Sequence, residues 1–94
     1  MYVISYDITS NKLRNKIAKT LEGYGRRVQY SVFECKITLK QYEILYKKLL
    51  ELMKDVTEGN IRIYKICMNC EQNIITIGVE RKEVELNKED IFIV

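Results

Sequence analysis

The chain of 94 residues contains no histidine. This absence excludes Ser-His-Asp triads, ribonuclease chemistry based on paired histidines, and metal sites that use histidine ligands. Any catalysis must therefore depend on a carboxylate with a metal ion, or on a tyrosine, lysine or cysteine side chain. A phosphodiesterase that uses a divalent cation remains compatible with this composition.

Long hydrophobic runs are also missing, so the sequence offers nothing that could span a bilayer. The first residues, MYVISYD, lack the basic start and the apolar stretch of a signal peptide. We therefore expect a cytoplasmic protein with no membrane association. With 47% hydrophobic and 31% charged residues, the chain is typical of a single globular domain with a modest core, which a partner protomer would help to stabilise.

Cysteine is scarce, and the three residues Cys35, Cys67 and Cys70 cannot all pair within one chain. A structural zinc site needs four ligands, and these cysteines supply at most three. We expect reduced thiols, as is usual in the cytosol. The C-x-x-C pattern at 67–70 follows an expected strand and is not expected to open a helix, which argues against a redox role.

Positive charge is mild overall, at +3, but it is concentrated in one region that contains a single acid, Glu22. The basic residues of this region are Lys12, Arg14, Lys16, Lys19, Arg26 and Arg27. Three of them fall in the opening turns of an expected helix, where the helix dipole disfavours cations unless an anion such as phosphate binds there. The patch is typical of polyanion binding, and equally of a solvated face.

Hydrophobic periodicity and capping signals predict six elements. Residues 2–8 alternate as a strand that places Tyr6 on one face and Asp7 on the other. The other expected elements are a helix between Ser10 and Gly23, β structure over 26–37, a helix between the capping-box residue Thr38 and Gly59, and strands at 60–67 and 74–79. Residues 26–37 are too long for one regular strand, so they form either a bent, bulged strand or two strands joined by a tight corner near residues 30–32.

This order predicts an α+β fold of the ferredoxin-like β-α-β-β-α-β type, with helices on one face of an antiparallel sheet. We assign residues 1–79 to this domain. Residues 80–94 form a charged linker and an apolar end, IFIV, which we expect to add as a strand to the edge of a sheet, that of a partner protomer.

Asp7 is the candidate for metal chemistry, because it ends the first strand just before a helix begins. The alternative is that it only caps the turn. A single carboxylate makes a poor Mg²⁺ site, since the ion takes six oxygens, commonly one or two carboxylates with waters and phosphate oxygens. A twofold homodimer would supply two copies of Asp7 to one shared Mg²⁺, which could then polarise a phosphodiester and activate the attacking water.

Aromatic residues give a weaker indication of nucleic-acid binding. Four of them could stack on nucleic-acid bases, namely Tyr6, Tyr24, Tyr30 and Phe33. Such residues belong more commonly to the hydrophobic core, and the pattern alone leaves both interpretations open.

Three motifs occur in the order YDI at 6–8, LRNK at 13–16 and VQYSVFE at 28–34. Together they resemble the CRISPR-associated protein two family, the smaller of the two general spacer-acquisition proteins, over roughly the first 66 residues. The resemblance implies a ferredoxin-like fold, a homodimer whose C-terminal strand crosses onto the partner's sheet, and a metal role for Asp7.

The resemblance also implies roles for particular residues. Tyr6, Asp7, Ser31 and Phe33 are expected to serve the reaction, and Arg14, Lys16, Arg26 and Arg27 to contact nucleic acid. Lys16 stands where some relatives have arginine, and Thr9, Ser10 and Asn11 stand where some have further acids.

Two functions follow from these expectations. The first is a metal-dependent endonuclease of CRISPR spacer acquisition in antiviral defence, acting on single-stranded RNA, double-stranded DNA or both. The second is a non-catalytic, dimeric DNA-binding scaffold within an integrase complex. A third alternative, a regulatory domain that binds a metabolite, gains little support from the basic patch.

Overall fold

The computed structural model describes residues 1–80. Its elements in chain order are β1 (Tyr2–Asp7), α1 (Asn11–Glu22), β2 (Arg26–Gln29), β3 (Val32–Cys35), α2 (Leu39–Met53), β4 (Asn60–Lys65) and α3 (Met68–Gln72). The expected C-terminal exchange strand lies outside the described residues. Within residues 1–80, no helix is long and apolar enough to cross a membrane.

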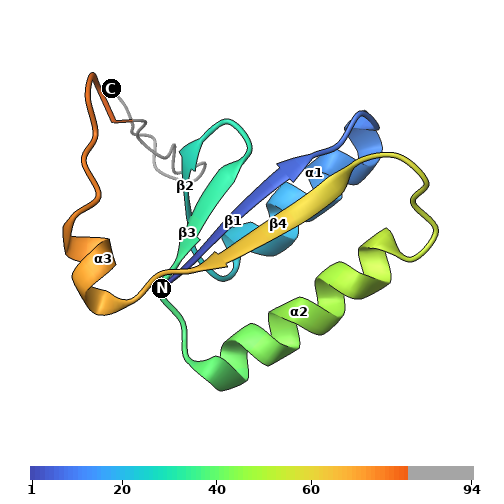
Figure 1. The fold of residues 1–94 in the computed structure, drawn as a ribbon. Coiled ribbons are helices and arrows are strands. Elements are labelled where there is room, and N and C mark those ends of the chain that lie inside the picture. The colour runs from blue at the N-terminus through green and yellow to red at the C-terminus, as the bar shows by residue number, and fades with distance from the viewer. Residues whose placement is uncertain (81–94) are drawn as a thin grey trace, which may run out of the picture.

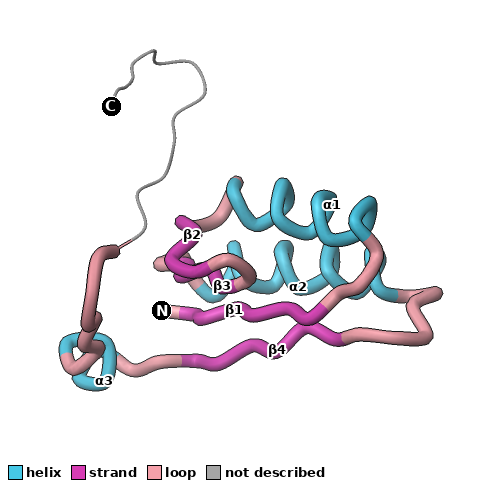
Figure 2. Tube along the Cα trace, turned by 90° about the horizontal axis from the view of Figure 1, so that it is seen from above, coloured by secondary structure: helices cyan, strands magenta, loops and turns pink. Residues whose placement is uncertain are grey.

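The four strands form one sheet in the order β2-β3-β1-β4, and every neighbouring pair is antiparallel. Strand β1 is central, with Tyr2 opposite Cys35 of β3 on one side and Lys65 of β4 on the other. Helices α1 and α2 both cover the same face of the sheet (Figures 1 and 2). This is the predicted α+β, ferredoxin-like arrangement, and the prediction is confirmed.

The core lies between this face and the two helices. Its β1 members are Tyr2, Ile4 and Tyr6, which are buried as the predicted alternation requires. The other buried members are Ile8, Ile17, Ala18, Leu21, Phe33, Cys35, Leu45 and Leu49. Full burial of one large apolar side chain contributes about 1.5–3 kcal/mol, so this layer supplies most of the drive to fold.

Both long helices begin at the predicted caps. Ser10 Oγ accepts a hydrogen bond from the Leu13 N–H at 3.2 Å. At α2 the capping box is complete, because Thr38 Oγ1 accepts from the Gln41 N–H and Gln41 Oε1 accepts from the Thr38 N–H. These bonds satisfy backbone donors that a helix start otherwise leaves without partners.

The region 26–37 contains both of the features that the sequence left as alternatives. Strands β2 and β3 are separate and are joined by a turn at Tyr30 and Ser31. A register shift between Arg27 and Gln29 adds a bulge to β2. A bulge increases local twist, so the hairpin bends without a glycine or proline at its corner.

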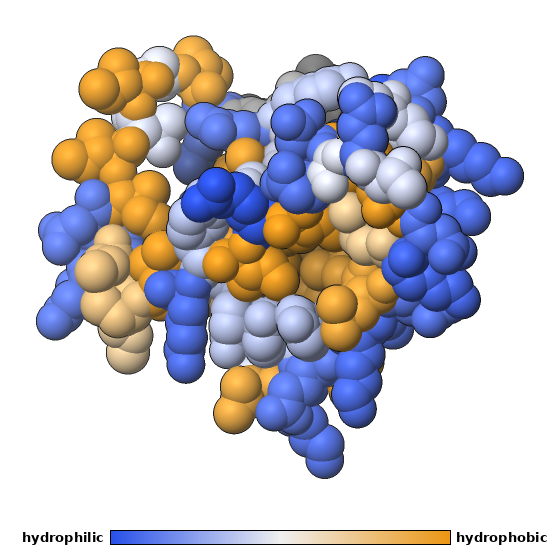
Figure 3. Space-filling model, turned by 45° about the vertical axis from the view of Figure 1, so that its right-hand side comes forward, coloured by the Kyte–Doolittle hydropathy of each residue, from blue (hydrophilic) through white to orange (hydrophobic). Residues whose placement is uncertain are grey.

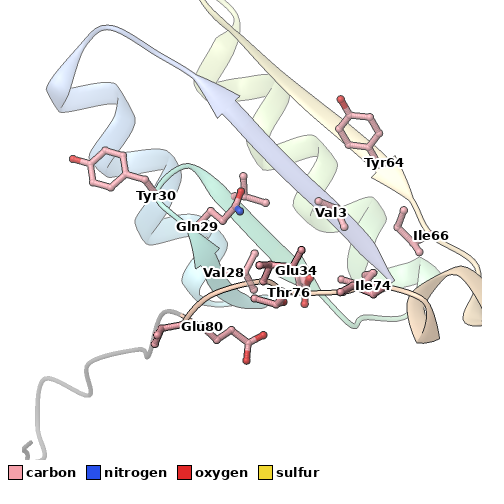
Figure 4. A pocket seen from close by; sticks show the side chains of 14 residues that line it. Val3, Val28, Gln29, Tyr30, Glu34, Tyr64, Ile66, Ile74, Thr76 and Glu80 are labelled. Atoms are coloured by element: carbon pink, nitrogen blue, oxygen red, sulfur yellow. The ribbon is translucent and has the colours of Figure 1, made fainter.

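The strand predicted at 74–79 is wrong, since these residues form no strand in the structure. Instead, the unpredicted helix α3 turns the chain at the end of β4, and residues 74–80 run as an irregular segment beside the sheet face that the helices leave open (Figures 1 and 4). The segment joins neither edge of the sheet, so its β-branched residues have no ladder to stabilise. Side chains of Ile75, Ile77 and Val79 are 82%, 94% and 97% exposed.

We expect Gly59→Ala to destabilise the fold by about 1–3 kcal/mol. Gly59 has φ 101°, and a Cβ placed there would lie 2.6 Å from the Asp7 carbonyl oxygen. Gly23→Ala is the matched control, because Gly23 has φ −77° and a Cβ would lie no closer than 3.5 Å to its neighbours; we expect a change within about 1 kcal/mol. Urea denaturation measures both, and equal losses would contradict this interpretation.

Candidate functional site

Asp7 is the last residue of β1, and its side chain is exposed. Its neighbour Tyr6 points into the core, so the strand's alternation directs Asp7 toward the open face of the sheet. Asn60 of β4 is its partner in the ladder, and Gly59 packs closely against the Asp7 carbonyl. Within residues 1–80, no group of three or more acidic or cysteine side chains could hold a metal ion; one chain therefore presents Asp7 without a complete ligand set.

Arg14 fixes the turn that follows Asp7. Its Nη1 donates hydrogen bonds to the carbonyl oxygens of Ile8, at 2.8 Å, and Thr9, at 3.5 Å. Its Nη2 donates to Asn11 Oδ1. The guanidinium thus ties the start of α1 back to the end of β1. The structure gives Arg14 a role in holding the β1–α1 turn, and its contact with nucleic acid stays a prediction.

Tyr6, Arg27 and Phe33 come together on the helix-covered side of the sheet. The Arg27 guanidinium carbon lies 5.2 Å from the centroid of the Phe33 ring, and Arg27 Nη2 donates to Tyr6 Oη at 3.4 Å. The Tyr6 and Phe33 rings stack with centroids 6.4 Å apart. A cation over an aromatic face is attracted by the ring quadrupole, so the two rings orient the guanidinium.

The aromatic residues differ widely in their access to solvent. Phe33 is completely buried and Tyr6 is 5% exposed, so both are core residues. Tyr24 is half-buried against the core, whereas Tyr30 is 69% exposed in the β2–β3 turn. Of the four aromatics considered for base stacking, Tyr30 has the most accessible ring.

Ser31 reaches Tyr6 through its backbone. The Ser31 carbonyl oxygen accepts a hydrogen bond from the Tyr6 N–H at 3.1 Å, which extends the pairing of β1 with the β2–β3 hairpin. The YDI and VQYSVFE motifs, remote in the sequence, therefore meet at this point in the fold.

The other basic residues are more dispersed. Arg26 forms ion pairs with Glu34 at 3.6 Å and Glu80 at 3.5 Å. Ion pairs at the protein surface, such as these, are each worth about 0–1 kcal/mol, so they can be exchanged for another anion at little cost. Lys16 is exposed on α1, as are Lys12 and Lys19.

Arg62 is a further candidate that the sequence analysis did not select. It pairs in register with Ser5, two residues before Asp7 on β1, and its exposed guanidinium lies 5.5 Å from the Tyr64 ring centroid. Arg62 lies on the open face of the sheet, the face of Asp7, because it alternates along β4 with Ile61 and Ile63, which pack against the core. The sequence did not reveal the pairing of Arg62 with Ser5, because this pairing depends on which strands are neighbours in the sheet.

An open groove of ≈ 640 Å³ lies between the open face of the sheet and the segment 74–80 (Figure 4). Its sheet-side walls include Val3, Val32, Tyr64 and Ile66, and the other wall includes Ile74 and Ile77. In Figure 3 a projecting group of hydrophobic residues lies at the upper left, where Figure 1 places this segment. A surface this apolar is typical of a contact with another chain.

The family model described as CRISPR associated protein Cas2 matches residues 1–74. A CRISPR-associated endoribonuclease Cas2 of Chloroflexus aurantiacus is 51% identical over 77 residues, which cover 82% of this chain and 83% of the relative.

Comparison with solved structures gives the same family. The crystal structure of Streptococcus pyogenes Cas2 has a TM-score of 0.72 and 29% identity, covering 82% of this chain and 98% of that one. A chain from a partial Cas6-RT-Cas1–Cas2 complex has a TM-score of 0.71 and 34% identity, covering 81% of this chain and 88% of that one. The resemblance drawn from the three motifs is confirmed, and the chain belongs to the Cas2 family of CRISPR-associated proteins.

Proposed function

We propose that this protein is a magnesium-dependent phosphodiesterase of CRISPR spacer acquisition, which acts as a homodimer on single-stranded RNA, double-stranded DNA or both. The observation that carries the proposal is the exposed carboxylate of Asp7, held at the end of the central strand by a turn that Arg14 fastens. The name of the 51% identical relative, an endoribonuclease, supports the same activity.

Dimerisation is supported by the apolar surface around the groove. A domain of this size buries a smaller fraction of its surface on folding than a larger domain does, and residues 75, 77 and 79 leave large apolar side chains in solvent. A second copy of the chain is the occupant that we propose, because a twofold interface covers the same patch on both subunits. The axis would bring the open sheet faces, and with them the two Asp7 carboxylates, toward one another.

The chemistry of Asp7 fits a hard cation such as Mg²⁺. Its carboxylate makes no ion pair with any residue from 1 to 80, and carboxylate oxygen is a preferred ligand of this ion. Two copies of Asp7, with waters and a phosphate oxygen, would satisfy the usual coordination number. When bound, the ion would polarise the scissile phosphodiester and lower the pKa of a bound water.

The protein's own basic residues would hold the nucleic-acid backbone on either side of this carboxylate pair, because Arg27 and Lys16 lie on the helix-covered side of the sheet and Asp7 on its open face. Arg27 and Lys16 bind phosphate oxygens, and Arg26 exchanges its two surface ion pairs for phosphate. Tyr6 and Phe33 are positioning residues, because they are buried and act on the substrate through the Arg27 guanidinium that they orient.

Two further residues maintain the backbone around the site. Ser31 keeps the β2–β3 turn against β1 through its hydrogen bond with Tyr6. Arg14 holds the β1–α1 turn, so that the backbone after Asp7 keeps its direction when the charged substrate arrives.

A second candidate function is a DNA-binding scaffold that an integrase partner uses without cleavage by this chain. The observation that favours it is the 34% identical chain in the structure named as a Cas1–Cas2 complex. In this role the basic side of α1 would track the duplex backbone, and Asp7 would be structural.

We expect Asp7→Asn to lower Mg²⁺-dependent cleavage by about 10²–10³-fold while leaving nucleic-acid binding nearly unchanged. The substitution keeps the side-chain shape and removes the charge that attracts the cation. Asp55→Asn is the matched control, because Asp55 is an exposed acid in the turn after α2. Cleavage of labelled RNA and duplex DNA, with Mg²⁺ or with a chelator, gives the readout, and binding is measured separately.

Cleavage that survives in Asp7→Asn would contradict the proposed role of this carboxylate. If the wild-type protein cleaves no substrate, but its complex with an integrase incorporates new DNA, the scaffold function replaces the enzymatic one.

We expect Ile77→Lys to weaken the dimer by about 10²–10⁴-fold, since each of two copies loses the burial of an Ile side chain, about 1.5–3 kcal/mol. Ile44→Lys is the control, because Ile44 is 48% exposed on α2, away from the groove. Sedimentation equilibrium measures both dissociation constants. A wild-type monomer, or equal effects of the two substitutions, would overturn the proposed interface.

A further inference from the structure

Cys67 and Cys70 form a contacting pair of thiols outside the site described above. Cys67 caps α3, and its Sγ accepts a hydrogen bond from the Cys70 N–H at 3.3 Å. Both residues are exposed and neither is in a disulfide. The expectation that this C-x-x-C does not open a helix is therefore wrong, because α3 begins at the residue after Cys67.

The spacing of the pair suits a disulfide bond. Residues three apart in a helical turn have Cα atoms about 5 Å apart, and a disulfide joins residues whose Cα atoms are about 4.4–6.8 Å apart. The bond can therefore form with a small adjustment of the side chains, and the surrounding turn does not need to unfold.

The two thiols differ in reactivity. The pKa of Cys67 is lowered, because its sulfur accepts hydrogen bonds from the Cys70 backbone N–H and then from the Cys70 thiol. The pKa of Cys70 is raised, because its thiol donates to Cys67 and would ionise beside a thiolate. Burial raises the pKa of Cys35 to about 11. A solvent-accessible thiolate is the attacking species in thiol–disulfide exchange, so Cys67 is the first nucleophile and Cys35 is protected.

The pair lies where the chain leaves the sheet. Just before it, the Ile66 N–H donates to the Met1 carbonyl at 2.8 Å. Just after it, Glu71 forms an ion pair with Lys36 at 2.9 Å. These contacts anchor α3 on both sides, and the segment 74–80 then starts its path past the open face of the sheet (Figures 1 and 4).

We propose that Cys67 and Cys70 are a reversible dithiol–disulfide pair that low-molecular-weight disulfides oxidise, and that the bond fixes the turn from β4 into the segment 74–80. The proposal uses no part of the Asp7 site, so each can fail without the other.

The exchange is balanced with oxidised glutathione as the oxidant. The Cys67 thiolate attacks one glutathione sulfur, the glutathione S–S bond breaks, and one glutathione leaves as a thiolate. The Cys70 thiol then loses its proton, and its sulfur attacks the Cys67 sulfur of the mixed disulfide, which releases the second glutathione. Two electrons pass from the cysteine pair to the oxidant, yielding two glutathione thiols.

The test equilibrates the full chain with set ratios of reduced and oxidised glutathione, quenches with acid, denatures the protein and alkylates the remaining thiols for mass spectrometry. We expect the wild-type protein to lose two alkylation sites together and to keep the Cys35 thiol. Cys67→Ser and Cys70→Ser each remove one partner at an exposed position. We expect both variants to stop at a mixed disulfide with glutathione.

If the fold holds the Cys67 and Cys70 thiols in position, their disulfide must form more readily in the native state than in the unfolded chain. We therefore expect the equilibrium constant with glutathione to be several-fold larger in native buffer than in concentrated urea, because a disulfide and the structure that favours it stabilise each other. An equal or smaller native value would overturn the proposal. So would a mixed disulfide that persists on wild-type Cys67, or predominant bonds between chains.

Amide hydrogen exchange tests the effect on the turn. We expect exchange at residues 68–74 to slow on oxidation in the wild-type protein, with exchange in α1 unchanged, because the bond suppresses local opening. Unchanged exchange at 68–74 would contradict the proposed effect of the bond on this turn.

Discussion

Strand β1 is buried on one face and paired along both edges, and the positions of the site residues follow from this constraint. Its inner side chains, Tyr2, Ile4 and Tyr6, pack under α1 and α2, while β3 and β4 pair on either side. A shift of one residue in register would turn that apolar set to solvent. The same alternation presents Asp7 on the open face, so the free energy that forms the core also fixes where the carboxylate points.

The sequence predicted the features that depend on local pattern. The fold class could be predicted from three local patterns: the alternation of residues 2–8, the capping box at Thr38, and the helical spacing of apolar residues in both long helices. Residues 74–79 misled the prediction, because β-branched propensity stabilises a strand only where a neighbouring strand pairs with it. Helix α3 was missed because a cysteine caps it, whereas serine, threonine, aspartate and asparagine are the usual signals.

Less of the candidate site than of the fold could be predicted. The motifs selected Arg27 and Phe33, but which ring supports which guanidinium depends on the pairing of β2 with β3 and on its bulge. Arg14 has the charge of a phosphate ligand, and its hydrogen bonds to three oxygens of the β1–α1 turn depend on the path of the folded chain there. Arg62 reaches the face of Asp7 through strand order, which hydrophobic periodicity alone does not reveal.

In the proposed homodimer, two copies of Asp7 would share one Mg²⁺ across a twofold axis. Isothermal titration of Mg²⁺ into the wild-type protein, with a non-hydrolysable nucleic acid bound, measures the stoichiometry of this shared site. We expect one ion for every two chains, and loss of that binding in Asp7→Asn. One ion per chain, or binding that the substitution leaves intact, would contradict the shared site.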